Sequence, residues 1–149
     1  MTEKKNIPFR ISGIETSQFA VDPGAYNEDG KIALSATVPI SASVEDHTIQ
    51  VALNVRFKCE SVSFIILEVK VKFDIEPATF DGLLVTKKKK TSVVIPVGLS
   101  RHLATLTVGT ARGVLHERLS KTKLNEFVLP TIDLTKILVE DVVLDKEAG

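Results

Sequence analysis

Few residues in this chain of 149 have the types and spacings that catalysis or metal binding requires. The histidines His47, His102 and His116 form no pair at metal-ligand spacing, and the single cysteine, Cys59, can assemble neither a thiolate zinc site nor an intrachain disulfide. The sequence contains no GxSxG motif, no phosphate loop and no dinucleotide fingerprint. We therefore expect no catalytic residue, no metal, no cofactor and no enzymatic activity.

A run of four lysines, Lys87–Lys90, is the one cluster with the chemistry to bind an anion. It opens a basic region, Thr86–Lys123, with nine basic residues and one acid, although the whole chain has a net charge of zero. Lysines in a loop neutralise phosphate but do not read bases, and 5% aromatic residues without tryptophan give no stacking platform. We predict a solvated loop and no nucleic-acid partner. A rival hypothesis is a nucleic-acid or anionic-partner module that uses this run with Arg112 and Arg118.

Four long runs in which apolar and polar residues alternate predict β-strands with one buried face. The expected strands are Phe9–Val21, with a bulge or bend near Gly13, then Lys31–Val44, His47–Cys59 and Val62–Glu76. Residues 45–47 and 60–61 are short enough for hairpin turns, so the last three strands form an antiparallel meander. Residues 23–30, which contain proline and glycine, connect the meander to the first strand.

Two helices are expected after the strands and a polar connection, Pro77–Thr91. The first runs from Pro96 to about Arg118, with an apolar stripe at Leu99, Leu103, Leu106, Thr110 and Val114. Asp133 is the predicted N-cap of the second helix, in which Leu134, Ile137, Leu138, Asp141 and Val142 fall at helical spacing.

Two glycines, Gly109 and Gly113, lie on one ridge of the predicted long helix, one turn after Thr105. A glycine inside a helix costs about 1 kcal/mol relative to alanine. The pair therefore indicates that another backbone passes close by, unless the glycines are merely tolerated.

These elements predict one α+β domain over residues 1–149, with residues 1–8 and 145–149 frayed. The fold would be a four-stranded antiparallel sheet of long strands, with the long helix and a short C-terminal helix packed on one face. Because two helices cover little more than one face, we expect the remaining apolar surface to meet another subunit or a client. No segment has the apolar length of a membrane span or the pattern of a signal peptide, so we expect a cytoplasmic protein.

The order of these elements resembles the SecB family of export chaperones, from about Phe9 to Leu138. Three pieces carry the resemblance: FAVDP at 19–23, the helix from Pro96 through TARG at 110–113, and LPTID at 129–133. The resemblance implies an ATP-independent chaperone, or holdase, assembled as a homotetramer from two dimers. It also implies apolar grooves that hold unfolded or partly folded polypeptides, such as preproteins awaiting export.

By position, the resemblance nominates residues for two surfaces. Contact between the helices of two dimers would involve Thr105, Gly109 and Gly113. The client-binding residues would be Phe19, Tyr26, Phe127, Leu129, Ile132, Leu134, Ile137 and Leu138, each of which could instead belong to the core.

Charge separates this chain from the pattern of the family. SecB proteins are strongly acidic and dock on the translocation ATPase SecA, whereas here Glu68, Asp74 and Glu76 alternate with Lys70 and Lys72. SecA is therefore a weaker expectation as a partner than an unfolded polypeptide. The alternative is a dedicated protein-interaction adaptor or client-specific chaperone, serving an antitoxin, phage or mobile-element protein without a role in export.

Overall fold

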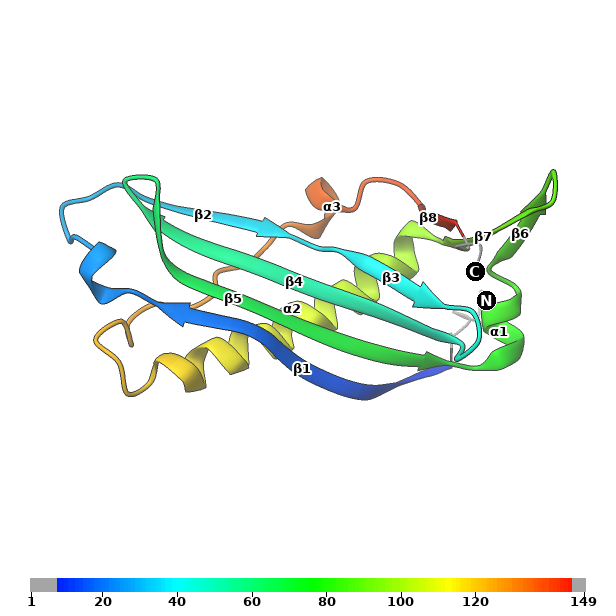
Figure 1. The fold of residues 1–149 in the computed structure, drawn as a ribbon, viewed down its shortest axis with the longest axis horizontal. Coiled ribbons are helices and arrows are strands. Elements are labelled where there is room, and N and C mark those ends of the chain that lie inside the picture. Colours follow the sequence, from blue (N-terminus) through cyan, green and yellow to red (C-terminus); the bar gives the residue numbers. More distant parts are fainter. Residues whose placement is uncertain (1–7, 146–149) are drawn as a thin grey trace, which may run out of the picture.

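Long antiparallel strands build a five-stranded sheet, which forms one layer of an elongated molecule (Figure 1). The computed structural model describes residues 8–145. The strand order is β1-β5-β4-β2, with β3 also paired to β4. The strands are β1 (Phe9–Val21), β2 (Ile32–Thr37), β3 (Ile40–Ser43), β4 (Thr48–Cys59) and β5 (Val62–Ile75). The α+β class and the meander from β2 to β5 are confirmed, but the described residues contain more than four strands.

The first strand is bulged at the predicted place and at one more. Its register against β5 shifts between Ile11 and Gly13, and again between Thr16 and Gln18. A short 3-10 helix, η1 (Pro23–Ala25), begins the connection from β1 to β2. The chain thus passes from one edge of the sheet to the other before the meander starts.

The predicted strand Lys31–Val44 is wrong as a single element, because β2 ends at Thr37 and β3 begins at Ile40. Pro39 lies in the gap and has no N–H to donate to a strand ladder. Its carbonyl still accepts a hydrogen bond from the Ala52 N–H at 2.9 Å, and the pairing with β4 keeps one register across the gap. A proline is tolerated here because β2 and β3 lie at the edge of the sheet.

A second sheet replaces the predicted polar connection Pro77–Thr91. The chain forms a short helix, α1 (Pro77–Asp81), and then a hairpin of β6 (Leu84–Lys87) and β7 (Lys90–Ile95). The third strand is β8 (Val142–Asp145), which pairs with β7. The lysine run is therefore the tip of a hairpin, because β-branched residues on both sides of it favour strands over a loop.

The long helix, α2 (Val97–Leu119), confirms the prediction, whereas the final helix is much shorter than its apolar spacing indicated. Helix α3 spans only Leu134–Ile137, with Asp133 as its N-cap; the Asp133 carboxylate accepts a hydrogen bond from the Thr135 N–H at 3.0 Å. Val142 lies in β8 instead. Asp141 accepts a hydrogen bond from the Val97 N–H at 2.9 Å, so it satisfies a free donor at the start of α2.

Helix α2 packs on β4 and β5 with a face that includes Leu99 and Leu103 of the predicted stripe but is rotated away from its other three residues (Figure 1). Leu106, Thr110 and Val114 are only half-buried. Small residues next to the large ones allow close packing on the sheet, and the buried Thr107 hydroxyl is satisfied by the Leu103 carbonyl at 2.9 Å. The buried face is Leu99, Ser100, Leu103, Ala104, Thr107, Val108, Ala111, Leu115 and Leu119.

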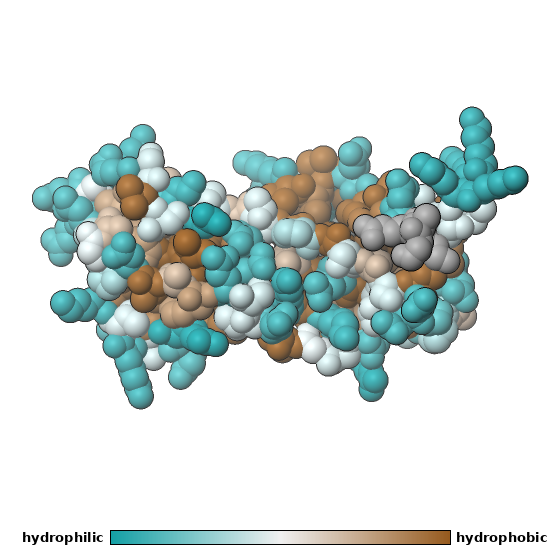
Figure 2. Space-filling model, in the orientation of Figure 1, coloured by the Kyte–Doolittle hydropathy of each residue, from teal (hydrophilic) through white to brown (hydrophobic). Residues whose placement is uncertain are grey.

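The other face of the sheet is mostly polar, so the remaining apolar surface expected from the sequence does not lie there. Figure 2 shows this face as mostly hydrophilic. The residues of β4 and β5 that alternate with the buried set include Gln50, Asn54, Arg56, Glu68 and Lys70. Uncovered apolar side chains must therefore be sought along the edges of the sheet and in the helical layer.

One glycine is required by close packing at the start of β2. A Cβ at Gly30 would overlap the Sγ of the buried Cys59 and lie 3.1 Å from the Asn27 carbonyl oxygen. We expect Gly30→Ala to lower the free energy of unfolding by about 1–3 kcal/mol, measured by chemical denaturation. Cys59→Ala should restore part of that loss in the double variant, and Gly24→Ala, where a Cβ makes only ordinary contacts, is the control. An additive double variant would contradict this explanation.

Two further predictions concern the ends of the chain and its helices. The frayed segments predicted at the termini fall on residues 1–7 and 146–149, outside the described residues, apart from Pro8 and Asp145. Pro8 accepts a hydrogen bond from the Glu76 N–H at 3.1 Å, and Asp145 accepts one from the Ser92 hydroxyl at 2.9 Å. Residues 8–145 contain no helix with the length and hydrophobicity of a membrane span.

Candidate functional site

The segment after α2 returns along the helix and is attached to it by two arginines. The Arg112 guanidinium donates to the carbonyls of Leu129 at 2.8 Å and Pro130 at 3.0 Å. Arg101 donates to the Leu138 carbonyl at 2.8 Å. Because these bonds use backbone acceptors, they fix the path of the segment without specifying its side chains. Arg112 is therefore engaged within the chain, although the rival hypothesis assigned it to an anionic partner.

Apolar side chains of this segment divide into an inner and an outer set. Leu129, Leu134 and Leu138 are buried in the core, although all three were candidates for client binding. Their neighbours point outward: Val128 is 55% exposed, Ile137 36% and Val139 66%. Val128 and Val139 were not predicted as binding residues. The only signal for them in the sequence is that each lies next to a leucine; the structure shows that these leucines are buried and that the segment pairs with no strand.

Four aromatic rings meet where this segment leaves the turn after α2. The Phe127 ring lies 5.1 Å from Tyr26, 5.8 Å from Phe57 and 5.1 Å from Phe64, between ring centroids. Phe57 and Phe64 are buried, whereas Tyr26 and Phe127 are half-buried at the surface. Burial, together with the carboxylates of Glu126 and Glu28, raises the pKa of Tyr26 above its usual value. Its hydroxyl therefore remains a hydrogen-bond donor at neutral pH.

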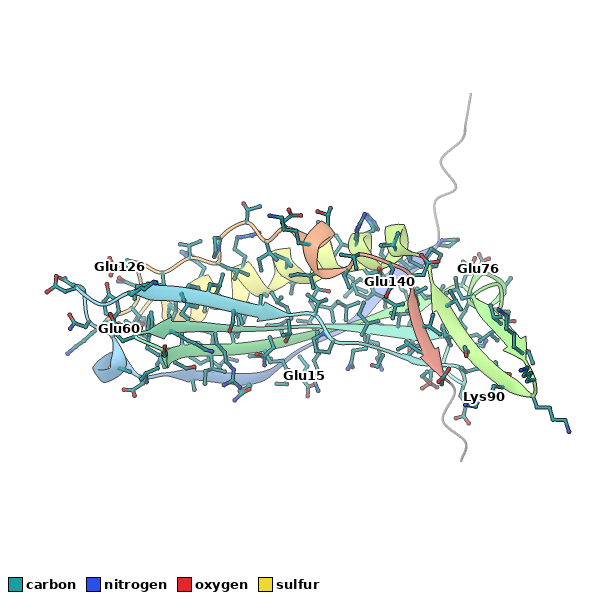
Figure 3. All side chains as sticks on the ribbon, turned by 90° about the horizontal axis from the view of Figure 1, so that it is seen from above. Glu15, Glu60, Glu76, Lys90, Glu126 and Glu140 are labelled. Atoms are coloured by element: carbon teal, nitrogen blue, oxygen red, sulfur yellow. The ribbon has the colours of Figure 1, made fainter. Side chains whose placement is uncertain are left out.

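A row of half-buried apolar residues follows the nearby edge of the sheet. Leu34, Ala36 and Ile40 pair with the core residues Phe57, Val55 and Val51 of β4 and point to the same side as they do. Val38, in the gap between β2 and β3, is half-buried like them and packs against the core. Figures 1 and 3 together place the C-terminal segment over this edge, in the same layer as α2. We call the combined surface the edge strip: Tyr26, Leu34, Ala36, Val38, Ile40, Phe127, Val128, Ile132, Ile137 and Val139. Figure 2 shows apolar residues gathered over β2, β3 and α3.

Phe19 is the one predicted client-binding residue that lies far from the others. It is on β1, at the opposite edge of the sheet, about 14 Å from β2 at the usual strand spacing. The Arg118 guanidinium lies over its ring, 5.6 Å from the centroid. The structure therefore joins Tyr26, Phe127, Ile132 and Ile137 in the edge strip and excludes Phe19 from it.

Gly109 and Gly113 line a hollow of about 470 Å³ between α2 and β1, together with Thr16, Thr110 and Val114. A Cβ added at either glycine would meet nothing within 4 Å. On the neighbouring part of β1, Ile11 is 43% exposed and Ile14 56%. Thr105 is exposed, and its hydroxyl bonds to the Arg101 carbonyl at 2.8 Å. Within the described chain no backbone approaches the glycines, so the space is available to another molecule.

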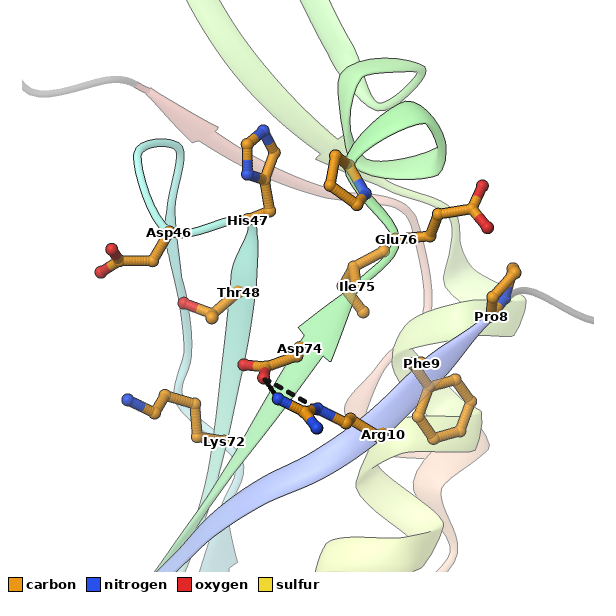
Figure 4. Close-up of a pocket in the computed structure, with 11 residues that line it drawn as sticks. Pro8, Phe9, Arg10, Asp46, His47, Thr48, Lys72, Asp74, Ile75 and Glu76 are labelled. Carbon is orange, nitrogen blue, oxygen red and sulfur yellow. Dashed lines mark hydrogen bonds and ion pairs between the residues drawn. The ribbon is translucent and has the colours of Figure 1, made fainter.

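A larger hollow, of about 570 Å³, opens where β1, β4 and β5 meet (Figure 4). Two of its charged side chains pair with each other: Arg10 Nη2 lies 3.2 Å from Asp74 Oδ2. Hydrogen bonding by the Ser12 hydroxyl and by Arg10 lowers the pKa of Asp74. His47 Nε2 is 3.6 Å from Asp81 Oδ1. Among residues 8–145, no three side chains of the metal-ligating types come together.

Comparison with known proteins finds similarity among solved structures only. The sequence matches no family model and no curated protein. Among solved structures, the fold is similar to a SecB-like chaperone from Mycobacterium tuberculosis, determined in complex with a ChAD peptide from the HigA1 antitoxin. That similarity has a TM-score of 0.49 and 13% sequence identity, and it covers 84% of this chain and 88% of the other.

Proposed function

We propose that this protein is an ATP-independent holdase that binds unfolded or partly folded polypeptides along the edge strip. The observation that carries the proposal is the exposure of Val128, Ile137 and Val139 on a segment whose backbone is held by Arg101 and Arg112. An extended apolar surface on a fixed frame is typical of a binding site.

The energetics suit a permissive binder. Full burial of a valine or isoleucine side chain contributes about 1.5–3 kcal/mol. The free energy from a few such contacts is partly offset by the entropy lost when the client is ordered, so the net affinity is moderate. Because the contacts are apolar, they set no strict sequence requirement. The half-buried row on β2 and β3 would extend the contact along the client chain.

Assembly and location belong to the same proposal. The hollow at Gly109 and Gly113, beside the exposed Ile11 and Ile14, favours packing of α2 against α2 of another copy, within a homotetramer. We propose a cytoplasmic protein of the SecB-like type, on the resemblance of the sequence. A role in export through SecA is the weaker part, because Lys70 and Lys72 lie between the acids of β5 and Arg10 pairs with Asp74 at 3.2 Å, which dilutes the negative charge of the polar face.

Suppression of aggregation tests the holdase proposal. A chemically denatured model protein is diluted into buffer with and without the purified protein, in the absence of ATP, and turbidity is followed. We expect suppression near one assembly per client chain. A folded protein that leaves aggregation unchanged would contradict the proposal and favour the second candidate, an adaptor for one dedicated partner, which would use the same strip.

A further inference from the structure

The β6–β7 hairpin projects from one end of the molecule and carries the four lysines at its tip (Figures 1 and 3). Lys87 and Lys90 are directly opposite each other on the two strands, and Lys88 and Lys89 form the turn. All four are exposed. Between residues 8 and 145, neither ion pair of the structure involves any of them.

These lysines are unfavourable for the hairpin itself. Like charges directly opposite each other in a sheet are destabilising. Lys88 and Lys89 have φ angles of 50° and 66°, in the left-handed region where a two-residue turn favours asparagine and glycine. The Glu60–Ser61 turn has similar φ angles, 49° and 69°, but there the Glu60 carboxylate accepts a hydrogen bond from the Lys31 N–H at 2.7 Å. Strained residues without such an internal role are typical of functional positions.

The base of the hairpin is anchored, so the charges are held in place. Leu83, Val93 and Ile95 are buried in the core. The Leu83 N–H donates to the Phe80 carbonyl at 2.8 Å, and the Leu83 carbonyl accepts from the Val94 N–H at 2.8 Å. A rigid arm loses little conformational entropy when a partner binds its tip.

The arm also offers a free strand edge. β6 is the outer strand of its sheet. The Leu83 carbonyl, which accepts from the Val94 N–H, points toward β7. The alternation of an antiparallel ladder therefore leaves the backbone groups of Leu84 and Thr86 pointing away from β7, where the described residues place no further strand. An extended polypeptide can pair with such an edge.

Nucleic acid fits this arm less well than polypeptide. The arm has neither arginine nor an aromatic residue with which to contact or stack bases.

We propose that the β6–β7 arm is a docking site for an extended, acidic polypeptide segment. The main chain of that segment would pair with β6 over about 13 Å, the length of four residues. Its carboxylates would contact the ammonium groups of Lys87–Lys90. This site is separate from the edge strip and does not depend on the proposed holdase function.

Binding of a fluorescein-labelled peptide of about twelve alternating valine and glutamate residues, followed by anisotropy, tests this proposal. The informative variant is Lys88→Asn with Lys89→Gly, which introduces the residues that the turn prefers. We expect a loss of affinity of about five- to tenfold, with an unfolding midpoint equal to or above that of the wild type. Lys121→Asn with Lys123→Asn removes the same charge elsewhere and should leave affinity unchanged.

Three results would overturn the proposal: no loss in the arm variant, an equal loss in the control variant, or tighter binding of duplex DNA that the arm variant abolishes. If the turn substitutions lower the unfolding midpoint, peptide affinity is measured for Lys87→Gln with Lys90→Gln instead, because this variant leaves the turn unchanged. The same loss of affinity is then expected. The arm variant should suppress aggregation as the wild type does. If the wild-type protein suppresses aggregation but does not bind the peptide, only the arm proposal is rejected. If it binds the peptide but does not suppress aggregation, only the holdase proposal is rejected.

Discussion

Leu138→Asp is expected to unfold the protein, whereas Val128→Asp with Val139→Asp should leave it folded and weaken polypeptide binding. Leu138 is buried, and an unpaired carboxylate there costs about 3–5 kcal/mol, a large part of the stability of a domain. Its neighbour Val139 is 66% exposed, so an aspartate at that position remains in water. Thermal unfolding should show a midpoint lowered by about 10 °C or more for Leu138→Asp alone.

The exposed pair is the test of function. Each valine removed from the edge strip should cost the complex about 1 kcal/mol or more, so Val128→Asp with Val139→Asp should weaken client binding at least tenfold. The control is Val85→Asp, which introduces the same charge at an exposed position of β6, away from the edge strip. The client used for all variants lacks acidic segments, so that it does not bind the β6–β7 arm. Two results would show that the edge strip does not bind clients. One is an equal loss of client affinity in the single variants Val128→Asp, Val139→Asp and Val85→Asp. The other is no loss of affinity in the double variant Val128→Asp with Val139→Asp.

Gly109→Glu with Gly113→Glu should break the assembly without harming the fold. A side chain at either position meets open space, and replacing a glycine inside a helix is favourable by up to about 1 kcal/mol. A second helix packed on this ridge could not accommodate two carboxylates. Light scattering should therefore report a mass below that of the wild type, for which we expect four times 16.3 kDa.

The matched control for the assembly is Gly98→Glu, which is equally open but lies at the start of α2, outside the hollow. Its mass should equal that of the wild type. A wild-type mass of one chain, or a tetramer that survives both glutamates, would contradict packing through the glycine ridge.

The large sheet was predictable because period-two alternation depends only on which face is buried. Pro23 follows the end of β1, and the short polar segments 45–47 and 60–61 indicate both hairpins of the meander. The break at Pro39 was visible in the sequence, since a proline cannot donate to a strand ladder, yet the alternation on both sides of it hid the gap.

The second sheet was not predictable by the same rules. The turn at Lys88–Lys89 has left-handed backbone without the glycine or asparagine that normally signals it. Val142 fitted a helical period with Leu134 and Leu138, and only pairing with β7 places it in a strand. Leu99 and Leu103 were predicted on the buried face of α2, but the rest of that face was missed because Ala104, Thr107 and Ala111 carry little apolar signal of their own.

The candidate site was half predictable. Sequence indicated that the segment around Leu129 and Ile137 matters, because it is apolar and follows a helix. Which side chains point outward depends on the backbone bonds from Arg101 and Arg112, which link positions 17 to 37 residues apart in the chain. No local pattern encodes such bonds.

Mapping a bound client by methyl NMR is the most direct test of the central claim. An unfolded polypeptide without acidic segments would be titrated into the protein, with the valine and isoleucine methyl groups assigned. We predict shifts at Val128, Ile137 and Val139, with Val85 unchanged. Binding that shifts Ile11 and Ile14 while those three methyls stay constant would contradict the account, as would the absence of any shift at saturating client.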